Sequence, residues 1–341
     1  MPPITAPPGK VTIATVAKAC GVAPSTVSRV LNQDKSFSLR PEIREKVVRK
    51  AQELNYRPQL AARSLRADKT RLIGLLGSSS VHANSGLTIE ANRALVNNLH
   101  QKGYDAFISY PNRNRHQSAL PPWSFDAAVV TSGDNDDAQK LLRQSGTPFV
   151  CMNAAAPGDN WAVVVDEAMG MSQAVDQLFQ LGHRRIAYLT SQSKKCHCSE
   201  DLREQAYETE MKRRELPVLT GSTDRKVVLA DALQHWIRNQ EATAVIVYDH
   251  LHAVRLLREA SKLGISIPND LSVICFNNEF PVAELRPSLS CIAISPSKLA
   301  EATTKLLMAH IEAGTEAPAQ RITIPVELVE RESTAPPPPK P

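Results

Sequence analysis

Residues 12–32, TIATVAKACGVAPSTVSRVLN, have the form of two short helices joined by a turn. Gly21 stands in the turn, where glycine can take a positive φ that other residues resist. Pro24 opens the second helix, where its missing N–H costs nothing. Val27, Val30 and Leu31 recur at helical spacing and are predicted to pack inward. The outer side is then left with Pro24, Ser25, Thr26, Ser28 and Arg29. This pattern predicts a helix-turn-helix that lays its second helix in the major groove of DNA.

A third helix is predicted over residues 41–55, where apolar residues recur at helical spacing: Ile43, Val47, Ala51 and Leu54. Three such helices make a bundle of about fifty residues, which is small but sufficient for a core. Residues 1–71 also hold 14 Lys and Arg against 5 Asp and Glu, whereas the rest of the chain holds 26 against 30. The basic surplus therefore lies in the segment with the helix pair, as phosphate neutralisation requires.

The chain of 341 residues is long enough for two or three domains. It shows neither an apolar run of membrane-spanning length nor a signal peptide, so we expect no membrane partner and a cytoplasmic location. Its six cysteines are scattered, which fits reduced thiols better than a disulfide framework. Cys196, His197 and Cys198 form the only cluster, and no further ligands stand at suitable spacing nearby, so we predict no metal site.

Two stretches, TVAKACGVAPSTVSRVLN (15–32) and REKVVRKAQELNYRPQLAARSL (44–65), closely resemble the DNA-binding end of the LacI/GalR transcription regulators. The resemblance continues more weakly to about residue 331. Its landmarks there are LGHRRIAYLT (181–190), LGISIPNDLSVICF (263–276) and RPSLSCIAISP (286–296). It implies a homodimeric regulator of the repressor type that binds a pseudo-palindromic operator in double-stranded DNA, associates with the nucleoid when bound, and responds to a small-molecule effector.

From residue 71 onward, near-continuous apolar strands alternate with helical stretches, which indicates parallel doubly wound α/β sheets. The pattern repeats on both sides of about residue 166, so two lobes are expected. The resemblance implies a periplasmic-binding-protein-like core in which the chain crosses between the lobes three times. The predicted domains are a disordered leader (1–10), a helix-turn-helix head (11–57), a hinge (58–70), a core (71–332) and a disordered tail (333–341). Within the core, lobe 1 is predicted as 71–166 with 294–322, and lobe 2 as 167–293 with 323–332.

Direct readout of base pairs needs side chains that reach the edges of the grooves. Arg29 can pair with guanine O6 and N7, a contact worth about 1–3 kcal/mol of discrimination, and pairing with phosphate alone is the alternative. Ser25 can donate or accept a hydrogen bond, and Pro24 can meet a thymine methyl. Thr26 and Ser28 suit phosphate contacts, which fix register without specifying sequence.

Residues 59–66 contain good helix formers but are too few to hold a helix alone in water, so a plain linker is one interpretation. The resemblance implies instead a hinge that becomes helical on DNA, beside its twin from a second subunit. The match ARSLR then places Leu65 as a wedge in the minor groove, where it bends the duplex. Arg63 and Arg66 would lie near that groove or the phosphates.

Doubly wound lobes bind ligands at the carboxyl ends of their strands, in the crevice between the lobes. The matching positions are Asn84, Ser85, Arg203, Asp249, Phe276 and Asn277. The resemblance implies a ligand-gripping role for Arg203, whose fork suits a carboxylate, a phosphate or a pair of sugar hydroxyls. Purine-binding members carry aromatic residues where this chain has Asn84, Ser85 and Thr223, which favours a small polar or sugar-like effector. A degenerate pocket without an effector is the alternative.

The sequence lacks the GxGxxG, P-loop and GxSxG motifs, and its His, Cys and Asp residues show no convincing nucleophile spacing. We therefore predict neither an enzyme nor a cofactor. A metabolite-binding protein whose head no longer acts on DNA is the alternative function. Between residues 111 and 124 the chain is short and proline-rich, so the helix that the resemblance implies there is expected to be missing or reduced to a turn.

Overall fold

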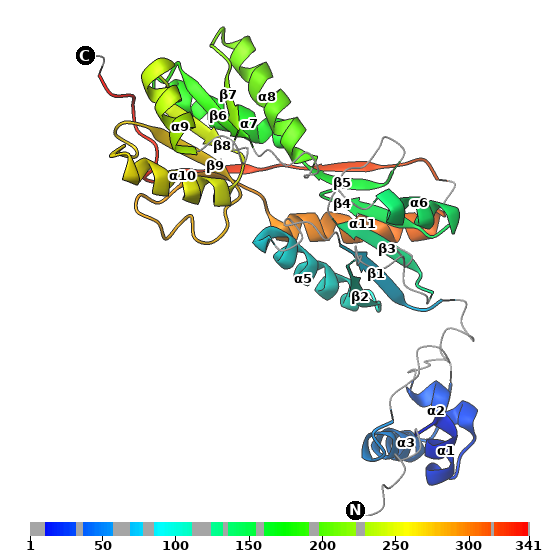
Figure 1. Cartoon of the computed structure of the whole chain (residues 1–341). Helices are drawn as coiled ribbons and strands as arrows, with labels where there is room; N and C mark the ends of the chain where they lie inside the picture. Colours follow the sequence, from blue (N-terminus) through cyan, green and yellow to red (C-terminus); the bar gives the residue numbers. More distant parts are fainter. Residues whose placement is uncertain are drawn as a thin grey trace, which may run out of the picture. The chain divides into compact units, whose positions relative to one another are not determined.

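The computed structural model describes residues 11–31, 37–56, 69–77, 85–110, 124–131, 136–154, 160–190, 198–222, 229–314 and 317–339. The chain divides into two compact units, a head up to Thr70 and a core from Arg71 (Figure 1). Each unit has a hydrophobic core of its own. The predicted hinge and the predicted helix-poor stretch at 111–124 lie almost wholly outside the described residues.

Three helices form the head: α1 (Ile13–Cys20), α2 (Pro24–Leu31) and α3 (Pro41–Glu53). Thr12 caps α1, because its hydroxyl accepts the Thr15 N–H and the Thr15 hydroxyl accepts the Thr12 N–H. Gly21 ends α1 in the left-handed conformation with a φ of 68°, which a side chain would strain. The predicted apolar stripes meet in one cluster with these buried members: Val16, Ala17, Cys20, Val27, Val30, Val47 and Ala51.

Two six-stranded sheets organise the core. The first has the order β11-β5-β4-β3-β1-β2 and consists of β1 (Leu72–Leu76), β2 (Asp105–Ser109), β3 (Ala127–Thr131), β4 (Phe149–Met152), β5 (Ala162–Val165) and β11 (Arg321–Ile324). The second has the order β12-β10-β9-β8-β6-β7 and consists of β6 (Ile186–Thr190), β7 (Leu219–Ser222), β8 (Ala244–Val247), β9 (Ser272–Phe276), β10 (Ser290–Ala293) and β12 (Glu327–Val329).

Helices cover both sheets, so central strands such as β3, β6 and β9 are buried along their whole length, as parallel sheets require. With the first sheet lie α5 (Gly86–Gln101), α6 (Asp136–Gln144) and α11 (Pro296–Ala313). With the second lie α7 (Glu167–Gln180), α8 (Ser199–Arg213), α9 (Leu229–Gln234), a π-helical turn (His235–Asn239) and α10 (His250–Lys262).

The path of the chain joins the two lobes. Among the described strands, sheet membership changes three times along the sequence, after β5, after β10 and after β11. The last change is made by β11 and β12, drawn in red in Figure 1, which follow each other with only two residues between them. β12 therefore enters the second sheet antiparallel to β10, whereas the other described pairings are parallel.

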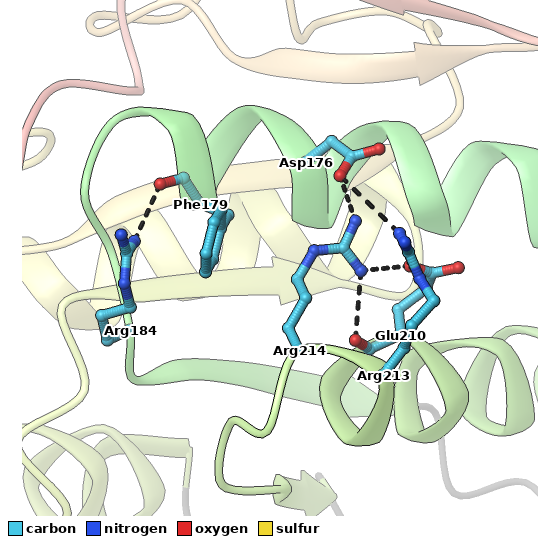
Figure 2. Close-up of polar contacts among 6 residues, drawn as sticks. All are labelled: Asp176, Phe179, Arg184, Glu210, Arg213 and Arg214. Carbon is cyan, nitrogen blue, oxygen red and sulfur yellow. Dashed lines mark hydrogen bonds and ion pairs between the residues drawn. The ribbon is translucent and has the colours of Figure 1, made fainter.

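Polar contacts hold α7 against α8 (Figure 2). Arg214, directly after α8, contacts both Asp176 of α7 and Glu210 of α8. The Arg214 side chain is only 8% exposed, so these contacts are shielded from water more than an ordinary surface pair. The arrangement positions two residues of the site, because α7 begins at Glu167 and α8 carries Arg203.

The predicted disordered tail is wrong for residues 333–335. Ser333 is fully buried, accepts the Ser290 N–H at 2.8 Å and donates to the Val273 carbonyl at 2.6 Å. His183 Nε2 lies 2.8 Å from the Ala335 carbonyl oxygen. The proline-rich composition suggested disorder, but residues 333–335 precede the prolines at 336–339 and complete hydrogen bonds of the second lobe.

Candidate functional site

Helix α2 turns its apolar residues toward the core of the head and leaves a polar face at the surface. That face contains the five residues of α2 predicted to contact DNA. Three of them are exposed, namely Pro24, Ser25 and Arg29, and two are half-buried, namely Thr26 and Ser28. The Arg29 guanidinium lies 4.9 Å from the centroid of the Phe37 ring. This cation–π contact orients a long side chain without neutralising its charge. Phe37 was missed by the sequence analysis, although it is an aromatic residue in a polar loop.

Four predicted site residues lie outside the described residues: Arg63, Leu65, Arg66 and Asn84. The first three belong to the predicted hinge and the last to the predicted effector pocket. Their roles therefore stay predictions.

A cavity of about 50 Å³ lies in the core where strands of both sheets end, with room for a few water molecules. Four of the residues predicted for the effector pocket line it: Ser85, Arg203, Asp249 and Asn277. Its wall also includes polar groups that the sequence analysis missed: Thr88, Thr131, Asn153, Ser199 and Tyr248. Apolar side chains complete it: Leu87, Ala91, Met152, Ile294 and Leu299. The cavity is thus a mixed polar and apolar site between the lobes.

The strand-end rule could have found most of the missed residues. Thr131 is the last residue of β3, Asn153 follows β4, and Tyr248 follows β8. Ser199 is different, because it opens α8 rather than closing a strand. The Ser199 hydroxyl forms a hydrogen bond of 3.0 Å with the Tyr248 hydroxyl, and no pattern in the sequence predicts this contact.

Arg203 is 3% exposed and makes contacts on several sides. Its Nε and Nη2 donate to the two carboxylate oxygens of Glu167 at 2.6 and 3.1 Å, and its Nη1 donates to the Tyr248 carbonyl at 2.6 Å. Burial alone lowers the pKa of Arg203, but the Glu167 carboxylate raises it, so the guanidinium stays charged. The resemblance implied a ligand contact for Arg203, and no pattern in the sequence pointed to Glu167.

Phe276 does not have the position predicted for it. It is fully buried and is not among the residues that line the cavity. Its ring centroid lies 4.0 Å from the Arg203 guanidinium, and that of Tyr248 lies 5.0 Å from it. Phe276 therefore supports the arginine instead of lining the cavity, and its ring also packs close to Gly170 of α7.

Asp249 and Asn277 are the polar groups of the second lobe at the ends of β8 and β9. Asp249 caps α10, and its Oδ1 accepts the His252 N–H and lies 2.7 Å from His252 Nδ1. Burial raises the pKa of Asp249, but the bonds from His252 outweigh burial and lower it, so the carboxyl is ionised. Asn277 has a φ of 72°, and its buried Oδ1 has no hydrogen-bond partner within the described part of the chain.

A contact beside the cavity connects the lobes. Glu279, which follows β9, accepts the Gly86 N–H at 2.5 Å at the start of α5. The positive end of the helix dipole favours a carboxylate at this place. A Cβ at Gly86 would approach the same carboxylate oxygen to 2.8 Å, so the glycine permits the contact. His250 Nε2 lies 3.8 Å from that oxygen.

The described residues contain no group of three or more His, Cys, Asp and Glu that could hold a metal ion, and Cys196 and His197 lie outside them. No helix among them is long and apolar enough to cross a membrane.

Comparisons with known proteins agree with this architecture. Residues 12–59 match the model of the bacterial regulatory proteins of the lacI family, and residues 175–334 match the periplasmic binding protein-like domain. The HTH-type transcriptional repressor PurR of Vibrio vulnificus is 27% identical over 316 residues, which cover 88% of this chain and 92% of that protein.

Solved structures show the same fold. The lac repressor dimer bound to operator and the anti-inducer ONPF has a TM-score of 0.80 at 22% identity, covering 95% of this chain and 99% of that chain. The complex of the transcriptional regulator CelR with cellobiose has a TM-score of 0.65 at 21% identity, with the same coverage.

These matches confirm the predicted fold class, a helix-turn-helix bundle followed by a two-lobed doubly wound core, and the predicted recognition. The matched family consists of regulatory proteins and not of enzymes, as the sequence analysis expected. The chain belongs to the LacI family of bacterial regulatory proteins and is a DNA-binding transcription regulator of the LacI/GalR type with a periplasmic-binding-protein-like core.

Proposed function

We propose that this regulator binds a pseudo-palindromic operator as a homodimer, with one α2 helix in the major groove of each half-site. The exposed polar face of α2, on a separately packed and basic head, is the observation that supports this proposal. Arg29 pairs with guanine, Ser25 and Pro24 contact neighbouring bases, and Thr26 and Ser28 contact phosphates. In the hinge, Leu65 wedges the minor groove between Arg63 and Arg66 and bends the operator.

Exposed apolar side chains support the dimer. Phe280 is 85% exposed, Ile89 54% and Leu251 45%. They lie on neighbouring segments, because Glu279 next to Phe280 contacts Gly86 near Ile89 and approaches His250 next to Leu251. Exposed apolar residues gathered in this way typically mark a protein contact. We assign this surface to a second copy of the chain, since the lac repressor structure with the same fold is a dimer on its operator.

The interlobe cavity is the proposed effector site, and a small polar or sugar-like compound is the proposed effector. Tyr248 is the only aromatic residue among the described residues that line the cavity, which gives little stacking surface for a flat aromatic ligand. Cellobiose in the CelR complex shows that this fold accommodates a sugar. Effector binding changes the arrangement of the lobes and the separation of the hinges. The free energy of this coupling cannot exceed the difference between the effector's binding free energies to the two lobe arrangements.

The regulator acts as a repressor in the cytoplasm, on the nucleoid, where its operator lies. The Vibrio vulnificus relative is named a transcriptional repressor, which supports repression, and not activation, as the effect of this protein on transcription.

Enrichment of genomic fragments by the purified full chain, followed by sequencing, tests the proposal. The expected result is a short set of fragments that share one site with two-fold symmetry. The Phe280→Asp variant should sediment as a monomer and fail to enrich that site, because one hinge cannot fold unaided. Enrichment of random fragments only would instead favour a metabolite-binding protein whose head no longer acts on DNA.

A further inference from the structure

In the part of the interlobe cavity that the structure describes, the only arginine or lysine is already paired with a carboxyl group. Among the described residues that line it, Arg203 and Asp249 are the charged ones. Glu167 lies behind Arg203 with a side chain only 5% exposed, and both of its carboxylate oxygens accept hydrogen bonds from that guanidinium. Among the described lining residues the formal charges of Arg203 and Asp249 cancel, and Glu167 adds a carboxyl group directly behind Arg203.

Arg203 keeps a limited capacity for a ligand. A guanidinium has five N–H donors, and three of those on Arg203 are engaged by Glu167 and the Tyr248 carbonyl. Phe276 and Tyr248 stack against it, which hinders rotation of the group toward a new partner. One N–H on each Nη remains for an oxygen in the cavity. The edge formed by Nε and Nη2, which would make a two-bond contact with a carboxylate or phosphate, is occupied.

Glu167 is held in place as a carboxylate. It is the first residue of α7, where the positive end of the helix dipole favours a negative charge. An incoming anion that took its partner would leave this carboxylate buried and unpaired, which is strongly unfavourable. A ligand therefore has to bind Arg203 while the Arg203–Glu167 pair stays intact.

We propose that Glu167 is a specificity-determining residue that restricts the effector to uncharged, polyhydroxylated compounds and excludes carboxylates and phosphates. Hydroxyl oxygens accept the two remaining N–H groups of Arg203. Hydroxyl hydrogens are donated to Asp249 and to Asn277 Oδ1, which has no partner within the described residues. A carboxylate or phosphate in the same place meets Glu167 and Asp249 as like charges. This inference rests on the proposed effector function of the cavity.

Paired probes test it with the full chain. Ribose is compared with ribose 5-phosphate, and glucose with gluconate, by calorimetric titration and by the melting temperature of the core. Inorganic sulfate serves as an anion that needs no sugar contacts. The variants are Glu167→Gln, which keeps the shape and removes the charge, and Glu167→Gln with Arg203→Met as the matched control. Glu167→Met replaces Glu167→Gln if the latter does not fold.

In the Glu167 variant, sulfate and the anionic probes should bind at least about tenfold more tightly than in the native chain, and the added Arg203→Met should abolish the gain. No gain in the Glu167 variant would overturn the inference. So would an anionic probe that binds the native chain more tightly than its uncharged counterpart and loses this preference in Arg203→Met. Operator binding without any probe is measured on the same preparations. Its absence would refute the proposed regulatory function while leaving the anion selectivity of the cavity to be decided by the titrations.

Discussion

Replacing Val47 with alanine should lower the melting temperature of the head and leave that of the core unchanged. Val47 is fully buried in α3 within the apolar cluster of the head. The substitution removes two methyl groups at about 0.8 kcal/mol each, and the cavity left behind raises the loss to about 2 kcal/mol. For a domain of this size, each kcal/mol corresponds to about 4–8 °C, so the head should melt about 8–16 °C earlier.

Scanning calorimetry of the full chain measures both transitions, because the head and the core have separate hydrophobic clusters. The matched control is Val48→Ala, the same change one residue further along α3, where the side chain is 39% exposed. Its effect should stay within about 0.5 kcal/mol. Equal shifts for the two variants, or a core transition that moves together with that of the head, would refute an independently packed head.

Three further predictions concern base readout, pH and the contact between the lobes. Arg29→Ala should weaken operator binding by about 1–3 kcal/mol and binding to random fragments far less; equal losses in fluorescence anisotropy would indicate phosphate contact alone. Burial lowers the pKa of His183 and His310, so the unfolded core takes up protons first and its free energy of unfolding should fall below about pH 6.5. Calorimetry at several pH values should find this fall reduced when both histidines are replaced by glutamine, and an unchanged fall would contradict the assignment. Glu279→Ala removes a charged hydrogen bond worth about 1.5–3 kcal/mol, so amide exchange at the start of α5 should accelerate at least about tenfold; unaltered exchange there would exclude its role between the lobes.

The head is the part that sequence patterns predict best, because its signals are local. A helix-opening proline, a turn glycine and a helical stripe suffice to place its helices, and the stripe residues Val47 and Ala51 are buried as predicted. The strands of the core can be predicted equally well, since parallel strands buried on both faces must be apolar throughout. The antiparallel β12 and the ordered residues 333–335 were beyond such patterns, because their partners come from distant segments of the chain.

The cavity shows the same limit. The rule that ligand sites lie at strand ends places Asp249 and Asn277 in the wall, and it places Phe276 there wrongly. Nothing in the sequence joins Glu167 to Arg203, which are 36 residues apart on two helices. Their pairing follows from how α7 packs on α8, and this is a property of the tertiary structure alone.

The placement of the last strands has a consequence for how the protein is made. Residues 321–329 supply β11 to the first sheet and β12 to the second, and Ser333 then bonds to the second lobe. A ribosome must therefore translate the chain as far as residue 324 before the first sheet is complete, and as far as residue 329 before the second is complete. Domains fold as units in the order of their synthesis, so the head is able to fold on the nascent chain well before the lobes close. Newly made protein should thus acquire its DNA-reading surface while the last strands of the core are still to be translated.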